Sequence, residues 1–104
     1  MSTFLLAYRG GGMAENQATQ ASVMAAWTAW FERLGAALVD GGNPLVRART
    51  IDADGSVSED TESSISGYSI IAAEDLDTAV EFARSCPVLE SGARIEVCET
   101  SLAI

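Results

Sequence analysis

Apolar and polar positions along the first half of the chain predict a strand followed by a helix. The apolar segment at residues 3–9 (TFLLAYR) runs into glycines, which indicates a strand that ends in a loop over 10–19. Over residues 21–38, apolar side chains recur every three or four positions, which is typical of an amphipathic helix. This stripe consists of Val23, Trp27, Trp30, Leu34 and Leu38. The turn-forming segment DGGNP at 40–44 is expected to end the helix.

Two more strands are expected in the middle of the chain. Residues 45–52 (LVRARTID) predict the first, and Asp54-Gly55 predicts a turn after it. Residues 56–66 are polar and acidic and are interpreted as a mobile loop or the weak return strand of a hairpin. Residues 67–73 (GYSIIAA) predict a strand that is apolar on both faces.

A second helix and a last strand complete the pattern. Residues 74–85 carry the stripe of Leu76, Ala79, Val80 and Ala83, with acidic residues at the start and Arg84 at the end, which suits the helix dipole. Residues 93–100 alternate Ile95 and Val97 with Arg94, Glu96 and Cys98. The order βαββαβ predicts an α+β, ferredoxin-like single domain over 1–104, with a four-stranded antiparallel sheet and two helices on one face.

The second face of the predicted sheet needs a cover. Two helices can pack on one face only, yet the strands at 3–9 and 67–73 are apolar on both faces. A second copy of the chain, related by two-fold symmetry, is the simplest cover. We therefore expect a homodimer.

Composition and charge narrow the function classes. The net charge is −9, with six arginines and no lysine, so the surface repels phosphate backbones and anionic lipids, and neither nucleic acid nor membrane is expected as a partner. A signal peptide and a transmembrane stretch are not recognisable, and two cysteines without metal or redox spacing suit the cytosol. Histidine is absent, which removes the commonest general base and neutral metal ligand. No metal and no cofactor are expected.

Six segments together span nearly the whole chain: TFLLAYRG, AAWTAWFERLGAAL, VDGGNP, SGYSII, EDLDTAVEFARSCP and SGARIEV. In their order and spacing they resemble the YCII-related family, whose members include the DGPF proteins. The resemblance implies a ferredoxin-like fold, a dimeric α+β barrel and a cleft near the dimer interface. Some members carry a His–Asp pair proposed as catalytic; here Met24 and Cys86 occupy those positions, and the DGPF motif is absent, its region being taken by residues 56–66. The family chemistry is therefore in doubt.

Two groups of residues are candidates for ligand contact. Tyr8, Arg9 and Tyr68 near strand ends could hold a small carboxylate at the mouth of a cleft, with the tryptophans interpreted as core. Asp40, oriented by Asn43, could act as a base or bind an amine, although this turn also needs such residues for its backbone.

Three other features have a structural interpretation. The glycines at 10–12 could face an anion but fit a flexible connection better, and the acidic residues at 52–62 fit a solvated loop better than a cation site. Cys86, at the end of the second helix, is interpreted as structural.

Three functions stay open on this basis. The domain binds a small polar metabolite in a cleft near the dimer interface, with weak or lost catalytic activity; or it is a protein-interaction or regulatory module, since some family members occur alongside transcription-initiation factors; or it has lost its ancestral chemistry altogether. Whether it is an enzyme is not decided by the sequence.

Overall fold

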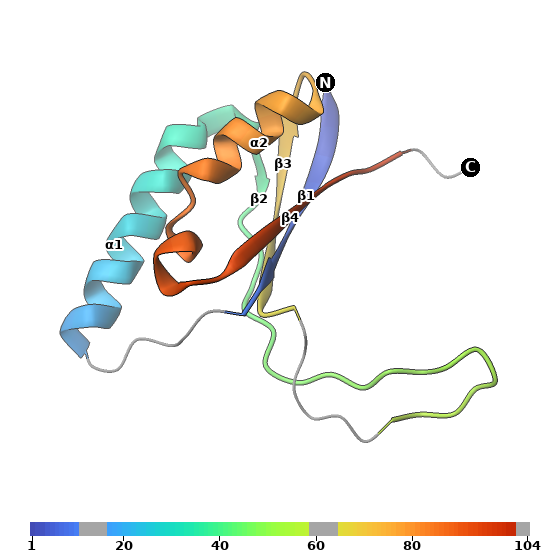
Figure 1. Cartoon of the computed structure of the whole chain (residues 1–104). Helices are drawn as coiled ribbons and strands as arrows, with labels where there is room; N and C mark the ends of the chain where they lie inside the picture. Colours follow the sequence, from blue (N-terminus) through green and yellow to red (C-terminus); the bar gives the residue numbers. More distant parts are fainter. Residues whose placement is uncertain (11–16, 59–64, 102–104) are drawn as a thin grey trace.

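A four-stranded antiparallel sheet with both helices on one side forms the body of the protein (Figure 1). The computed structural model describes residues 1–10, 17–58 and 65–101. Its elements are β1 (Ser2–Arg9), α1 (Gln17–Leu34), the 3₁₀ turn η1 (Gly35–Ala37), β2 (Leu38–Asp40), β3 (Gly67–Ala73), α2 (Leu76–Arg84), the 3₁₀ turn η2 (Pro87–Ser91) and β4 (Arg94–Glu99). The strand order is β2-β3-β1-β4, which confirms the ferredoxin-like arrangement.

The core lies between the sheet and the two helices. Phe4 and Leu6 of β1 and Ile71 of β3 are fully buried there. Trp30 of α1 is also buried, and its Nε1 donates hydrogen bonds to the carbonyl oxygen of Phe82 and to Ser85 Oγ, both at 3.1 Å. Because a buried indole N–H needs an acceptor, this residue fixes α1 against the end of α2. The prediction that Trp30 belongs to the core is confirmed.

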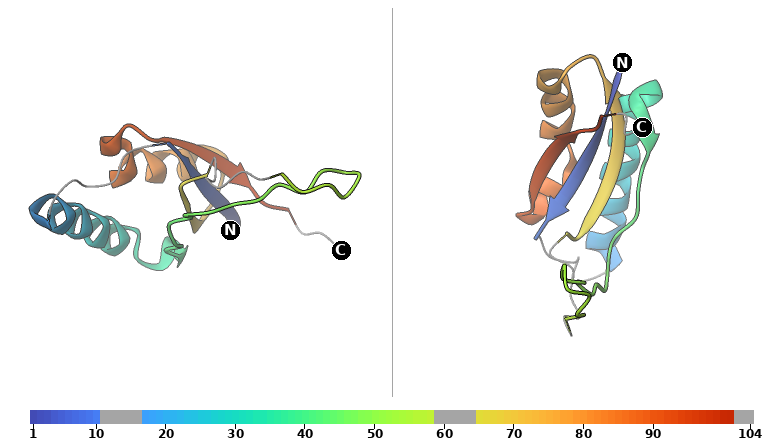
Figure 2. Two further views of the ribbon diagram at one scale, coloured as in Figure 1. Left: turned by 90° about the horizontal axis from the view of Figure 1, so that it is seen from below. Right: turned by 90° about the vertical axis from the view of Figure 1, so that its right-hand side faces the viewer.

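Strand alternation divides the sheet into a helix-covered face and an open face. In β1, Phe4 and Leu6 point to the helices, so Leu5, Ala7 and Arg9 point the other way. Residues directly opposite one another on neighbouring strands share a face, so the register extends this division to β3 and β4. We define the open face as Thr3, Leu5, Ala7, Arg9, Tyr68, Ile70, Ala72, Arg94, Glu96 and Cys98. Neither helix lies over it (Figure 2).

The second strand differs from the prediction. Residues 45–52 form no named strand; their one bridge joins Ile51 to Val57 across the turn at Asp54-Gly55. Instead, α1 ends at Leu34, Gly35 takes φ +53°, and β2 follows at Leu38–Asp40. The left-handed glycine stops the helix four residues before its apolar stripe ends. Leu38 was therefore wrongly assigned to the helix: it packs against the same core from a strand.

The predicted helix stripes also extend too far. Val23 is 42% exposed and Leu76 is 44% exposed, so both lie outside the core that their spacing predicted. Residues 20–25 of α1 are all exposed, because this half of the helix extends beyond the body of the molecule (Figure 1). The rest of the pattern is confirmed: β1, β3, α2 and β4 match the predicted segments closely.

The connection between β2 and β3 extends away from the body as an arm, which we define as residues 45–58 (Figure 1). At its base, the Leu45 backbone N–H donates to the carbonyl oxygen of Ser66 at 2.9 Å. At its tip, the Asp52 N–H donates to Ser56 and the Gly55 N–H to Asp52, both at 2.8 Å, and Gly55 takes φ +91°. The Asp54-Gly55 turn is thus confirmed, within a projecting arm.

Candidate functional site: a shallow arginine-lined depression

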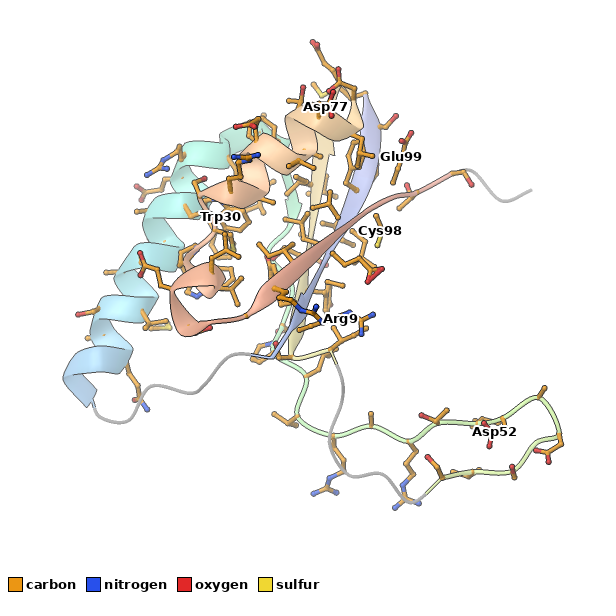
Figure 3. The ribbon with its side chains drawn as sticks, viewed as in Figure 1. Arg9, Trp30, Asp52, Asp77, Cys98 and Glu99 are labelled. Atoms are coloured by element: carbon orange, nitrogen blue, oxygen red, sulfur yellow. The ribbon has the colours of Figure 1, made fainter. Side chains whose placement is uncertain are left out.

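A shallow depression of about 360 Å³ lies where β1 ends and β4 begins, and three of its four lining residues belong to the open face. It is lined by Arg9, Arg94, Ile95 and Glu96. Figure 3 shows Arg9 and Cys98 on the side of the sheet that faces away from the helices. The depression is therefore part of the surface for which the sequence predicted a cover.

Two guanidinium groups meet at this place. Arg9 stands directly opposite Arg94 in the antiparallel register. One carboxylate is nearby: Glu96 Oε1 lies 3.3 Å from Arg9 Nη2. Within the described part of the chain, Arg94 forms no ion pair, and the buried Nε of Arg9 has no hydrogen-bond acceptor.

This arrangement leaves positive charge and one buried N–H group without a partner among the described residues. Like charges directly opposite on neighbouring strands destabilise a sheet, and a buried charged donor without an acceptor loses its hydration. Because two guanidinium groups face one carboxylate, the site has a net charge of about +1. An acceptor with two oxygens, such as a carboxylate, would satisfy both the charge and the free N–H.

Tyr8 lies on the other face of the sheet and is buried. Its hydroxyl donates to Ser69 Oγ at 2.7 Å, and Ser69 Oγ donates to the Gly41 carbonyl oxygen at 2.7 Å. Burial raises the pKa of the Tyr8 phenol well above its usual value, so it stays protonated. The structure thus places this predicted ligand contact inside the core and apart from Arg9.

The two positions of the family's His–Asp pair have different surroundings. Met24 is 68% exposed on α1, whereas Cys86 is buried in the core. Burial raises the pKa of the Cys86 thiol, and burial raises that of Cys98 as well, with Glu96 adding to the effect. Neither cysteine is an activated thiolate at neutral pH.

Asp40 and Asn43 lie at the β2 side of the sheet, and Asp40 is separated from β1 by β3. Asp40 Oδ1 accepts a hydrogen bond from the Gly42 N–H at 2.8 Å, so its carboxylate supports the turn. Tyr68, by contrast, lies on the open face together with Arg9. It pairs with Ala7 of β1, which in turn pairs with Glu96 of β4. Of the five predicted ligand contacts, the structure brings Arg9 and Tyr68 to the same face.

Sequence reasoning missed Arg94 and Glu96 as site residues. The signal was present, because the alternation in the last strand places both opposite to the core-facing Ile95 and Val97. Charged residues on a face that needs a cover are unusual unless they meet a partner charge. What the sequence could not give was the register that sets Arg94 against Arg9.

The remaining residues that the sequence suggested as ligand or metal contacts give little support for a site. Asp52 and Asp54 both bond Ser56 within the arm, and residues 59–62 lie outside the described residues. Gly10 takes φ +77°, and residues 11 and 12 are likewise not described. Across 1–10, 17–58 and 65–101, no cluster of three or more acidic, Cys or His side chains could hold a metal ion. In the same ranges, no helix has the length and apolarity needed to cross a bilayer.

Comparison with known proteins assigns the fold to a family. The model of the YCII-related domain matches residues 1–101. The chain belongs to the YCII-related domain family. The fold of this chain is also similar to a solved structure, that of 5-chloro-2-hydroxyhydroquinone dehydrochlorinase (TftG) from Burkholderia phenoliruptrix AC1100 in complex with 2,5-dihydroxybenzoquinone. The TM-score is 0.51 and the identity 24%, with 90% of each chain covered. No curated protein matches the sequence.

Proposed function

We propose that this YCII-related domain binds a small polar ligand with an anionic oxygen group in the depression on its open face. The observation that carries the proposal is the direct opposition of Arg9 and Arg94, with Glu96 as their one acidic partner among the described residues. An anionic oxygen group would supply the missing negative charge and accept charge-assisted hydrogen bonds from both arginines.

The ligand class follows from the donors. Arg94 and the Nε of Arg9 offer N–H groups that suit a carboxylate or an acidic ring hydroxyl. Tyr68 lies on the same face and could lie against a ring. The ligand bound to TftG, 2,5-dihydroxybenzoquinone, is a small ring with oxygen substituents, which is the size proposed here.

Binding, rather than catalysis, is the activity that the described residues support. The chain has no histidine, and burial raises the pKa values of Tyr8 and Cys86, so neither provides a base or nucleophile near neutral pH. Asp40 is engaged by the Gly42 N–H and lies apart from the depression. An enzyme of this family without its His–Asp pair would need another source of acid–base chemistry.

We further propose that the open face is the interface of a homodimer. Leu5, Ile70 and Ala72 form an apolar centre on this face, and no described helix lies over it (Figure 2). The depression lies at the edge of this surface, so a second copy would deepen it into a cleft. Two cysteines in the thiol form suit the reducing cytosol, which is the proposed location. The expected mass in light scattering is twice the 10.9 kDa of the chain.

A protein partner is the second candidate function, and the exposed half of α1 favours it. Val23 and Met24 are exposed there, beside the half-buried Trp27. An amphipathic helix with apolar side chains in solvent is a common docking element.

Calorimetric titration with 2,5-dihydroxybenzoquinone and benzoate, and with neutral benzyl alcohol for comparison, tests the proposal. We expect the acidic compounds to bind, the alcohol not to bind, and the affinity to fall with salt. Arg94→Ala should weaken binding roughly tenfold or more, because a charge-assisted hydrogen bond is lost. The matched control is Arg84→Ala, an exposed arginine of α2 paired with Glu81 at 3.3 Å. Unchanged affinity of Arg94→Ala, or no binding of any acid, overturns the ligand proposal in favour of a protein partner.

A further inference from the structure

The arm at residues 45–58 exposes apolar side chains along its length. Val46 is 85% exposed and Ile51 is 70% exposed, and Leu45 and Val57 are exposed as well. Such a concentration of large apolar residues on a projecting segment usually marks a surface that another molecule covers. These four side chains are therefore left largely uncovered by the described part of the chain.

The arm also carries two exposed arginines and a stretch of backbone without hydrogen bonds to the described residues. Among the described residues, 46–49 make no hydrogen bond and no ion pair, although they include Arg47 and Arg49. An isolated two-stranded ribbon is marginally stable in water, so a short hairpin of this kind needs contacts beyond its own turn. The two arginines carry positive charge on a chain whose net charge is −9.

The arm lies on the same side of the sheet as the open face. Figure 1 shows it leaving the end of the sheet and extending away from the helices, and the second view in Figure 2 places it beyond that same end. A copy packed against the open face would thus lie beside the arm. The ten residues from the arm's base to its turn span roughly 30 Å when extended, whereas four strands are roughly 15–20 Å wide. The arm is long enough to cross a partner's sheet.

We infer that the arm of each protomer clasps a second copy of this chain. Val46 and Ile51 would cover apolar surface of the partner, and Arg47 and Arg49 would meet its acidic surface. The inference rests on the homodimer of the proposed function and adds to it an exchange of arms. The occupant is a second copy because its open face must stand next to the arm, and because an acidic body complements the arm's two arginines.

Paramagnetic broadening in mixed dimers tests this directly. A nitroxide is attached at Val46→Cys in a Cys98→Ser background, where the remaining Cys86 is buried, and this protein is mixed with isotope-labelled chain that carries no nitroxide. With the nitroxide chain in excess, we expect amide signals from the body of the isotope-labelled partner to lose most of their intensity. A nitroxide at Met24→Cys on α1 is the matched control, being exposed on the helix side, and should broaden none of the signals that Val46→Cys affects.

The outcomes separate the two proposals. A monomeric mass in light scattering overturns the dimer and the clasp together. A dimeric mass without broadening of the isotope-labelled chain overturns the clasp and leaves the open-face dimer. A dimeric mass with broadening across the mixed pair supports both. In that last case, Val46→Asp combined with Ile51→Asp should raise the dimer dissociation constant roughly tenfold or more, and Met24→Asp should not.

Discussion

Single residues show how polar groups are accommodated under the helices. Ser69 is fully buried and joins the Tyr8 hydroxyl to the Gly41 carbonyl, with both contacts at 2.7 Å. Ser69→Ala leaves both of these buried groups without their partner, so we expect the free energy of unfolding to fall by about 2–3 kcal/mol. Tyr8→Phe removes one donor and should cost about 1 kcal/mol. Urea unfolding of both variants measures the difference.

The double variant provides the control for this polar chain. If Tyr8 and Ser69 act through one hydrogen bond, the loss in the double variant should be smaller than the sum of the two single losses. Strict additivity would mean that the Tyr8 hydroxyl depends on another neighbour, and Cys86, whose thiol lies close to it, is the candidate.

Gly42 is the glycine whose replacement should do the most damage. It takes φ +78°, and a Cβ built there would clash with the carbonyl oxygen of Tyr68. We expect Gly42→Ala to lower the free energy of unfolding by more than about 3 kcal/mol, because the backbone of β3 must move. Gly55→Ala is the control, with φ +91° and open space around it, and should cost about 1 kcal/mol. Equal losses in thermal unfolding would contradict this account.

From the sequence, only the side-chain types in the site and their alternation along each strand could be predicted. Tyr8 and Arg9 are neighbours in sequence, so they point to opposite faces, and only Arg9 lines the depression. Tyr68 was placed correctly near a strand end but could not be assigned to a face without the register. Arg94 lies far from Arg9 in the sequence and meets it because β4 pairs with β1, which is a property of the fold.

At the scale of elements, α2 depends on its first residue for stability and for pH response. Asp75 is the N-cap, and its Oδ1 accepts from the Thr78 N–H at 2.8 Å; hydrogen bonding by Thr78 lowers the pKa of this carboxyl. Since the folded-state pKa is the lower one, the stabilisation is complete above the ordinary aspartate range and is lost as pH falls through the folded value. Asp75→Ala should therefore destabilise the domain near neutral pH and much less in acid.

Asp75→Asn separates the cap from the charge. Asparagine caps a helix about as well as aspartate but does not titrate, so this variant should stay close to the native protein at about pH 6. At about pH 3, Asp75→Asn should still exceed Asp75→Ala in free energy of unfolding by the same amount as at about pH 6. The native protein should exceed Asp75→Ala by less than it does at about pH 6. Urea midpoints of the three proteins at both pH values decide this, and parallel pH dependence in all three would exclude Asp75 as the titrating group.

The spacing of apolar residues predicted the end of the first helix wrongly. Leu34 and Leu38 are four residues apart and both pack on the core, so the pattern extends a helix across them. Gly35 interrupts it, and Leu38 reaches the same core from β2, which pairs with β3 beside Ile71. In contrast, β3 and α2 were predicted well because turn residues, a cap and Pro87 mark their ends locally. The element that the sequence did not predict, β2, depends on its long-range pairing with β3.

At the scale of the whole molecule, the open face joins the proposed ligand site and the proposed assembly. The depression occupies the β1–β4 end of this face, and the apolar centre at Leu5 and Ile70 adjoins it. A ligand held partly by one copy and covered by the other would bind the dimer better than the monomer. By linkage, such a ligand strengthens dimerisation by the same factor.

A single charge at the centre of the open face should therefore dissociate the dimer. Ile70 lies on β3 opposite Leu5, and Ile70→Glu would bury a carboxylate without a counter-ion in the interface. We expect the molar mass to fall to that of one chain, and the melting temperature to lose its dependence on protein concentration. Leu76→Glu is the matched control, since this residue of α2 is exposed on the helix side and its variant should stay dimeric. If Leu76→Glu dissociates the dimer and Ile70→Glu does not, the copies associate through the helices, and neither the cleft nor the clasp can form as proposed.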